Sequence, residues 1–189
     1  FECTVITLKS GGLYEQRIKN AGVRVLSLNM KRGSLSLSSL IKFYTICKKL
    51  KPDIIQGWMY HGNFFAFIYK LFFLKKIPIL WNIRATLYDV NKERLNTQII
   101  IYILKYISSF VDLIIYNSEI SRQQHFKLGF SKKNSKIIYN GFDINFWKPN
   151  FFIKQKIRNQ FDIKNSTVII GFAARNRPMK DIPNFLENI

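Results

Sequence analysis

Short runs of β-branched and aromatic residues alternate with longer helical patterns along most of the chain, and this alternation limits the fold more than any other feature. The short runs are apolar on both faces, which is typical of parallel strands buried between layers of helices. Gly22 and Gly129 come directly after two helical patterns and Pro52 just after a third, and both residue types commonly end helices. The sequence therefore predicts an α/β fold built on a doubly wound parallel sheet.

The bounds of the predicted elements follow from these patterns. We expect strands at residues 3–8, 23–28, 53–56, 79–83, 113–116, 136–139 and 167–173, and helices at 14–21, 37–50, 63–74, 95–110, 120–128 and 153–161. Turn residues cluster at 140–152, and such a cluster is typical of a domain boundary. We therefore predict one domain at 1–145 and the start of a second at 146–189. Because the chain opens without Met and inside an apolar run, we expect a fragment of a longer protein.

The composition is strongly basic, with 30 Lys and Arg against 11 Asp and Glu and a net charge of +19. Nucleic acid, an anionic membrane face or phosphorylated substrates are partners that fit this charge, and an ordinary solvated surface is the alternative. The lysines are spread along the chain, no nucleic-acid recognition motif is present, and most aromatic residues fall inside apolar runs. We therefore expect no nucleic-acid partner.

The cysteines and histidines are too few and too scattered for a predicted metal site. Cys3 and Cys47 lie far apart, and no Cys, His or Asp cluster surrounds His61 or His125. A reduced, cytoplasmic protein without a metal ion is the expectation.

Two kinds of segment bear on membrane association. The apolar run at 99–116 is long enough to span a bilayer, but Lys105 and Asp112 interrupt it, so we predict no span. Basic helical patterns at 41–51 and 72–78 are typical either of packing on a sheet or of binding an anionic membrane face. The sequence leaves both interpretations open.

Ligands of doubly wound sheets bind where the strands end, so the loops that follow the strands hold the candidate site residues. "RNRPMKD" follows the last predicted strand, with Arg175 at the strand end and Lys180 at a predicted helix start. An arginine that forms two hydrogen bonds at once, a lysine and a helix N-terminus are groups that bind a diphosphate. The same residues are equally compatible with an exposed loop that contacts only solvent. Neither a P-loop nor a GxGxxG fingerprint is present.

A second candidate loop, "GWMYHGN", follows the third predicted strand. His61 in this loop is either a structural residue or a group that contacts a sugar hydroxyl or a developing charge. We expect Trp58 and Tyr60 to be packing residues rather than stacking platforms.

The motifs, taken in order, resemble glycosyltransferase family 4. They are "GWMYHGNFFAF", "WNIR", "YNSEISRQQHFKLGF", "IIYNGFDINFWKP", "IRNQFDI" and "IIGFAARNRPMKDIPNFL", and together they cover nearly the whole chain. The resemblance implies a GT-B architecture, in which two Rossmann-like domains face each other across a cleft. It also implies transfer of a sugar from a nucleotide-sugar donor with retention, without a cofactor or a metal ion.

The resemblance also implies roles for particular residues. Arg175 and Lys180 would bind the donor diphosphate and stabilise the departing nucleotide, while Arg177 would be solvated. His61 matches the position of a catalytic His near the transferred sugar.

Further residues follow from the same resemblance. Arg84 would line the acceptor side, and Asn140 and Gly141 would lie at the crossover near the cleft. The family's first strand and Gly-rich loop have no counterpart, since "SGG" at 10–12 follows what would be the second strand and is interpreted as a turn.

The sequence thus predicts a glycosyltransferase with a glycan or lipid-linked acceptor, in cell-surface polysaccharide or lipopolysaccharide synthesis. We expect it in the cytoplasm, peripheral on the inner face of the membrane. The alternatives are a non-catalytic fragment and, from another class, a basic nucleic-acid-binding module. Donor sugar, nucleotide, acceptor and linkage are not encoded in these motifs.

Overall fold

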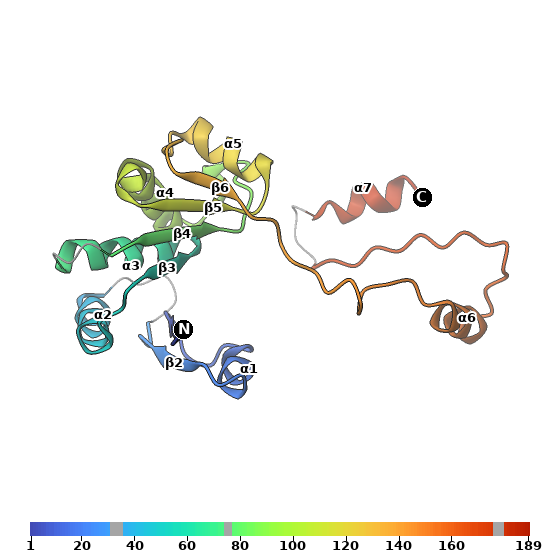
Figure 1. Ribbon diagram of the computed structural model, residues 1–189. Helices are drawn as coiled ribbons and strands as arrows, with labels where there is room; N and C mark the ends of the chain where they lie inside the picture. The colour runs from blue at the N-terminus through green and yellow to red at the C-terminus, as the bar shows by residue number, and fades with distance from the viewer. Residues whose placement is uncertain (31–35, 74–76, 176–179) are drawn as a thin grey trace. The chain divides into compact units, whose positions relative to one another are not determined.

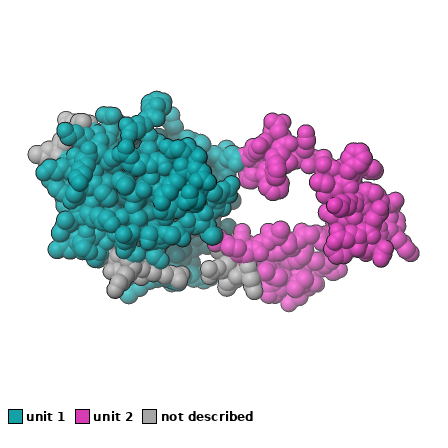
Figure 2. Space-filling model, turned by 90° about the horizontal axis from the view of Figure 1, so that it is seen from below, with its two compact units in different colours: residues 1–141 teal, residues 142–189 magenta. Residues whose placement is uncertain are grey.

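The chain divides into two compact units, Phe1–Gly141 and Phe142–Ile189 (Figures 1 and 2). The computed structural model describes residues 1–30, 36–73, 77–175 and 180–189. The sequence prediction placed the division between residues 145 and 146, inside the cluster of turn residues that opens the second unit.

The strands of the first unit are all parallel, which confirms the predicted α/β class. They form two sheets where the sequence predicted one. The two-stranded sheet contains β1 (Thr4–Thr7) and β2 (Arg24–Ser27), and the four-stranded sheet has the order β3 (Ile55–Trp58), β4 (Ile79–Ile83), β5 (Leu113–Tyr116) and β6 (Ser135–Ile137).

Helices connect these strands, as the alternating pattern predicted. They are α1 (Glu15–Asn20), α2 (Leu37–Leu50), α3 (Met59–Phe72), α4 (Leu95–Ile107) and α5 (Glu119–Leu128), with 3-10 turns η1 (Val90–Lys92) and η2 (Ser108–Phe110). The second unit contains α6 (Phe151–Gln160) and α7 (Ile182–Glu187). The predicted bounds of α2 are confirmed, whereas α3 begins at Met59 rather than at residue 63.

The early start of α3 depends on a close approach between this helix and β3. A methyl group added to Gly57 would lie 2.6 Å from the Cα atom of Asn63, so only a residue without a side chain fits there. Asn63 is fully buried, and its Oδ1 accepts a hydrogen bond from the backbone N–H of Asn82 at 3.3 Å. One side chain therefore joins the first turns of α3 to both β3 and β4.

The four-stranded sheet has two unlike faces. Gly57, Trp81 and Ile114 are in register on the face that packs on α3, and Trp81 and Ile114 are buried. The next residue along each of these strands projects from the opposite face, because successive side chains of a strand alternate. These residues are Trp58, Asn82 and Ile115, which are also in register. Trp58 is exposed there.

His125 of α5 is a core residue, completely buried among aromatic rings. Its Nδ1 donates to the carbonyl of Ser121 at 2.7 Å, which leaves Nε2 to accept from the hydroxyl of Tyr60 at 3.0 Å. Burial lowers the pKa of His125 from 6.5 to about 4, more than the bond to Ser121 raises it. The imidazole is therefore neutral at physiological pH.

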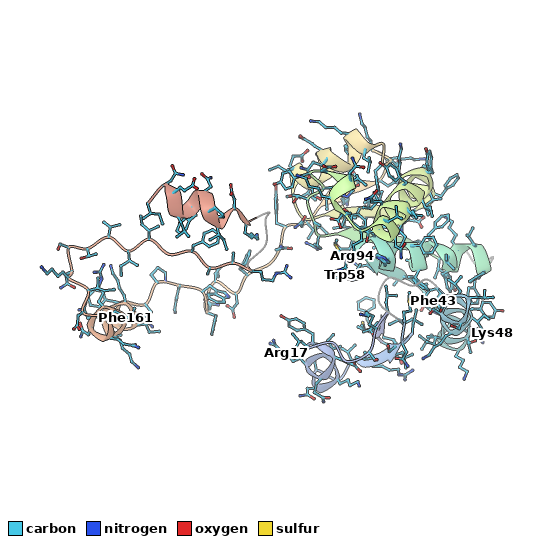
Figure 3. The ribbon with its side chains drawn as sticks, turned by 180° about the vertical axis from the view of Figure 1, so that it is seen from behind. Arg17, Phe43, Lys48, Trp58, Arg94 and Phe161 are labelled. Carbon is cyan, nitrogen blue, oxygen red and sulfur yellow. The ribbon has the colours of Figure 1, made fainter. Side chains whose placement is uncertain are left out.

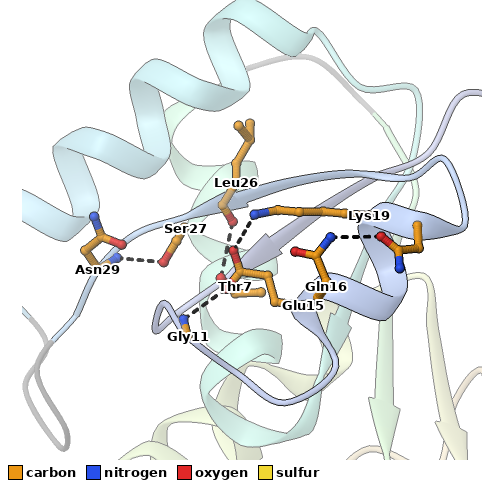
Figure 4. Close-up of polar contacts among 9 residues, drawn as sticks. Thr7, Gly11, Glu15, Gln16, Lys19, Leu26, Ser27 and Asn29 are labelled. Atoms are coloured by element: carbon orange, nitrogen blue, oxygen red, sulfur yellow. Dashed lines mark hydrogen bonds and ion pairs between the residues drawn. The ribbon is translucent and has the colours of Figure 1, made fainter.

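The glycines after β1 form a turn, in agreement with the interpretation of "SGG" (Figure 4). Gly11 has a φ of +73°, and its N–H donates to the carboxylate of Glu15 at 2.9 Å. Glu15 also pairs with Lys19 at 2.8 Å. A phosphate would have to compete with this carboxylate for the amide of Gly11.

The second unit has almost no buried residues. Arg158 of α6 is the one buried residue in its described part, donating to the carbonyls of Lys164 at 2.5 Å and Thr167 at 2.8 Å. The strand predicted at 167–173 is extended chain without a pairing partner, so that prediction is wrong for this structure. A strand needs a neighbour to satisfy its backbone groups, and the described chain supplies none here.

A pair of glycine variants tests the approach of α3 to β3. Gly57→Ala should lower the free energy of unfolding by about 1–3 kcal/mol, because the added methyl group would overlap the backbone of Asn63. Gly62→Ala is the matched control. Its methyl group would have ordinary contacts at 3.8 Å, and alanine favours a helix, so stability should stay equal or rise by up to about 1 kcal/mol. Urea unfolding of the full chain measures both, and equal stabilities would contradict the proposed packing.

The buried His125 predicts a loss of stability in mild acid. Its folded pKa lies below 6.5, so the unfolded chain binds the proton more readily. The stabilisation is complete above pH 6.5 and is lost as the pH falls towards 4. Between about pH 7 and pH 5 the loss should be about 2 kcal/mol.

Urea unfolding of the wild type and of His125→Gln measures this dependence. The variant should be less stable at neutral pH but should vary less with pH. His61→Gln is the comparison variant. His61 is only half-buried, and although burial also lowers its pKa, the substitution should change the pH dependence less than His125→Gln. Identical pH dependence in the wild type and His125→Gln would rule out this role for the buried imidazole.

Candidate active site at the carboxyl ends of the strands

Three strands of the larger sheet bring candidate residues to one edge. Trp58 ends β3, Arg84 directly follows β4, and Asn140 lies just beyond the end of β6. Because the strands are parallel, these positions meet at the carboxyl edge of the sheet, where α/β folds bind ligands. Two of the predicted site residues, Arg84 and Asn140, are in direct contact although they lie 56 residues apart.

Arg84 is the centre of this edge. Its Nε donates to Oδ1 of Asn82 at 2.7 Å, and its Nη1 donates to the carbonyl of Ile138 at 2.8 Å and to Oδ1 of Asn140 at 3.1 Å. These bonds fix the plane of the guanidinium and tie the end of β4 to the segment that follows β6. The side chain is half-buried, so the remaining guanidinium surface is open to a ligand.

Trp58 lies against this arginine. The guanidinium carbon of Arg84 is 5.6 Å from the centre of the indole ring, within the range of a cation–π contact. The tryptophan is 57% exposed, so the prediction that it is a packing residue is wrong. Figure 3 labels its side chain. The prediction is confirmed for Tyr60, which is buried beside His125.

Helix α5 holds the loop that follows β4. The hydroxyl of Ser121 donates to the carbonyl of Ala85 at 2.6 Å, and Oε1 of Gln124 accepts from the N–H of Leu87 at 2.7 Å. Ser118 caps the same helix by accepting from the N–H of Ser121 at 3.1 Å. The motif "NSEISRQQ" therefore serves to position the loop of Arg84.

The junction between β3 and α3 positions His61. Met59 has a φ of +59°, which is uncommon for a residue with a side chain and often accompanies functional sites. Its Sδ accepts from the N–H of Arg84 at 3.3 Å. His61 follows in the first turn of α3, half-buried, and burial lowers its pKa, so the imidazole is neutral at pH 7. No contact among the described residues joins His61 to Arg84.

Asn117 follows β5 at this edge of the sheet and was not predicted as a site residue. Its Oδ1 is buried without a hydrogen-bond partner in the described part of the chain. Buried polar atoms without partners are uncommon in folded proteins and mark places where a ligand or water binds. Its position directly after a strand was the signal that could have singled it out.

The predicted donor-site residues belong to the second unit. Arg175 and Lys180 are both exposed, and Arg177 lies outside the described residues. Lys180 borders a concavity of about 500 Å³, where the rings of Phe172 and Phe185 lie 4.7 Å apart. Arg175 does not line this concavity, and the described contacts do not bring the two cations together.

The predictions for Gly141 and for metal ions are not tested by the structure. Gly141 is exposed at the end of the first unit, with open space around its Cα atom, and its proposed place near a cleft stays a prediction. No three His, Cys, Asp or Glu side chains cluster within the described residues, so independence from metal ions also stays a prediction.

Cys3 and Cys47 are both free, and burial raises the pKa of the Cys47 thiol to about 12.

The parallel α/β architecture is that of a Rossmann-like domain of the GT-B glycosyltransferases. The model of Glycosyltransferase Family 4 matches residues 1–146, and the chain belongs to this family. This confirms the resemblance found in the ordered motifs. The chain matches no curated protein sequence.

Solved structures show the same fold. HepE from Anabaena in complex with UDP and glucose superposes with a TM-score of 0.65 at 20% identity, covering 84% of this chain and 42% of HepE. HepE in complex with UDP-glucose gives a TM-score of 0.63 at 21% identity, covering 86% of this chain and 42% of HepE. The chain therefore spans less than half the length of the HepE structures.

Removing the guanidinium of Arg84 tests whether it holds the segment after β6. The N–H of Ile138 is bonded to the carbonyl of Tyr116. Because Arg84→Met removes the bond to the carbonyl of Ile138, amide hydrogen exchange at Ile138 should become about fivefold faster, which corresponds to about 1 kcal/mol. Arg122→Met is the matched control, because Arg122 pairs with Glu119 inside its own helix. Unchanged exchange at Ile138 in Arg84→Met would refute the role.

Proposed function

We propose that the protein transfers a sugar from a nucleotide-sugar donor to a glycan or lipid-linked acceptor, with retention of configuration. The family match over residues 1–146 carries this proposal. The arrangement of Arg84, Asn140 and Trp58 at the carboxyl edge of the sheet supports it, since ligands of such sheets bind there.

The chemistry of this edge suits a sugar acceptor. The exposed indole of Trp58 offers an apolar surface against which the C–H face of a sugar ring can pack. Arg84 and Asn140 offer donors and acceptors for hydroxyl groups beside it. His61, neutral at pH 7, can form a hydrogen bond with a sugar hydroxyl without adding a fixed charge.

The donor in this proposal is a UDP-linked hexose, because the HepE structures of the same fold contain UDP and UDP-glucose. Arg175 and Lys180 bind its diphosphate. Two cations placed there offset the charge that develops on the departing nucleotide, which is how this chain would stabilise the transition state without a metal ion. No cofactor takes part.

The acceptor belongs in this proposal to cell-surface polysaccharide or lipopolysaccharide synthesis, and the protein acts on the cytoplasmic side of the membrane. The basic charge of the chain, +19, supports a site of action next to anionic lipid.

Release of UDP from UDP-glucose by the full-length protein, in the presence of candidate acceptors, tests the function. Arg175→Ala combined with Lys180→Ala should lower turnover by roughly a hundredfold or more, because fixed positive charges at a leaving group contribute on that scale. Arg177→Ala, which lies between these two residues in the sequence, is the matched control and should retain turnover.

Two results would count against the proposal. Unchanged turnover in the double variant would remove the role of the two cations. Absence of UDP release with every donor and acceptor would favour the alternative of a non-catalytic protein.

A further inference from the structure

Helix α4 is apolar on two opposite sides, although the fold buries only one of them. Ile100, Ile101 and Leu104 are almost completely buried in the core. The outward residues, named here the α4 face, are also apolar: Leu95, Ile99, Tyr102, Ile103, Tyr106 and Phe110. They recur at helical spacing along the whole helix and into η2, so they form one continuous stripe rather than scattered side chains.

The α4 face is exposed to an unusual degree. Tyr106 is 72% exposed, Leu95 69%, Phe110 61% and Ile99 50%. A helix that is apolar all round is normally buried, and a continuous exposed apolar patch marks a surface that binds another molecule.

The neighbouring helix ends extend this apolar surface. Leu71 and Phe72 at the end of α3 are exposed, and α3 packs against α4. The ring of Phe72 lies 5.8 Å from that of Tyr44, which α2 contributes. Three helices therefore expose apolar and aromatic side chains on adjacent elements.

The charges on these three helices have one sign. Within their bounds α2, α3 and α4 carry no acidic residue and five lysines, namely Lys42, Lys48, Lys49, Lys70 and Lys105 (Figure 3 labels Lys48). In contrast, α1 and α5 of the same unit contain Glu15 and Glu119 beside their own basic residues, so each carries charges of both signs.

Two of these lysines lie at the α4 face itself. Nζ of Lys105 is 5.1 Å from the ring centre of Tyr106, and Nζ of Lys70 donates to the carbonyl of Phe110 at 2.6 Å. Long lysine side chains beside aromatic rings are typical of surfaces that lie at a membrane–water boundary.

We propose that the α4 face, with the lysines of α2, α3 and α4, docks on the surface of an anionic lipid bilayer. Apolar and aromatic side chains enter the headgroup region while the lysines bind lipid phosphates. A second copy of the chain is a poorer occupant, because it would bring five more lysines against the same surface. An acidic lipid surface complements both the apolar stripe and the charge.

The helix lies on the bilayer in this proposal. No helix in the described ranges is long and apolar enough to cross a membrane. The sequence left open whether residues 41–51 and 72–78 pack on a sheet or bind an anionic membrane face. The first coincides with most of α2, and the second lies partly outside the described residues. The structure adds α4 as the apolar element.

Co-sedimentation with vesicles tests this surface, using phosphatidylcholine alone and phosphatidylcholine mixed with phosphatidylglycerol. The full chain should bind the anionic vesicles and bind the neutral ones far more weakly. Ile99→Gln combined with Tyr106→Gln should lower binding to anionic vesicles at least about tenfold, since two apolar side chains no longer enter the bilayer. Both residues are exposed, so the fold should be retained, and circular dichroism checks this.

Matched variants separate this surface from general stickiness. Tyr14→Gln combined with Ile120→Gln alters equally exposed side chains on other elements and should leave binding unchanged. Lys48→Gln combined with Lys49→Gln should weaken binding by about fivefold for each charge removed, whereas Lys9→Gln combined with Lys127→Gln should have a smaller effect.

The outcomes decide between occupants. Equal binding to neutral and anionic vesicles, or equal losses in the α4 and control variants, would overturn the proposal. A different result would assign the face to a second copy of the chain. In that case the wild type is a dimer, the variant Ile99→Gln with Tyr106→Gln is a monomer, and neither binds vesicles. UDP release with a soluble acceptor should be the same in these variants, so failure of membrane docking is distinguishable from failure of the proposed function.

Discussion

The close approach of α3 to β3 at Gly57 is the constraint on which the candidate site depends. Without a side chain at this position, the first turns of α3 reach the sheet, and Asn63 bonds to the backbone of β4. Met59, between these two residues, has a positive φ, and its sulfur accepts from the N–H of Arg84. The contact between α3 and β3 therefore lies beside both His61 and the start of the arginine loop.

Arg84 shows how a site is assembled from distant parts of a chain. Its partners come from the end of β4 and from the segment after β6, while α5 holds the loop that carries it. Each of these groups satisfies a backbone or side-chain polar atom that would otherwise lie unpaired at the sheet edge. The exposed ring of Trp58 gives this edge a surface with both apolar and polar parts.

The distribution of charge and apolar surface is uneven around the first unit. Helices α2, α3 and α4 combine lysines with exposed apolar side chains, whereas α1 and α5 carry acidic residues. Burial of His125 as a neutral group keeps charge out of the core next to α5. The lysines of α2, α3 and α4 therefore accompany an exposed apolar stripe, which the net charge of +19 by itself does not describe.

Local signals in the sequence were enough to predict the α/β class, the bounds of α2, β4 and β5, and the family. These signals are alternating apolar runs, helix-ending residues and ordered motifs. The sequence also singled out Arg84 and Asn140. Tertiary structure alone decided that these two residues meet, that Trp58 faces solvent and that α4 exposes a second apolar side. The strand predicted at 167–173 failed for the same reason. Pairing, burial and contact depend on segments far apart in the chain, and local patterns of apolar residues do not encode which neighbour covers which face.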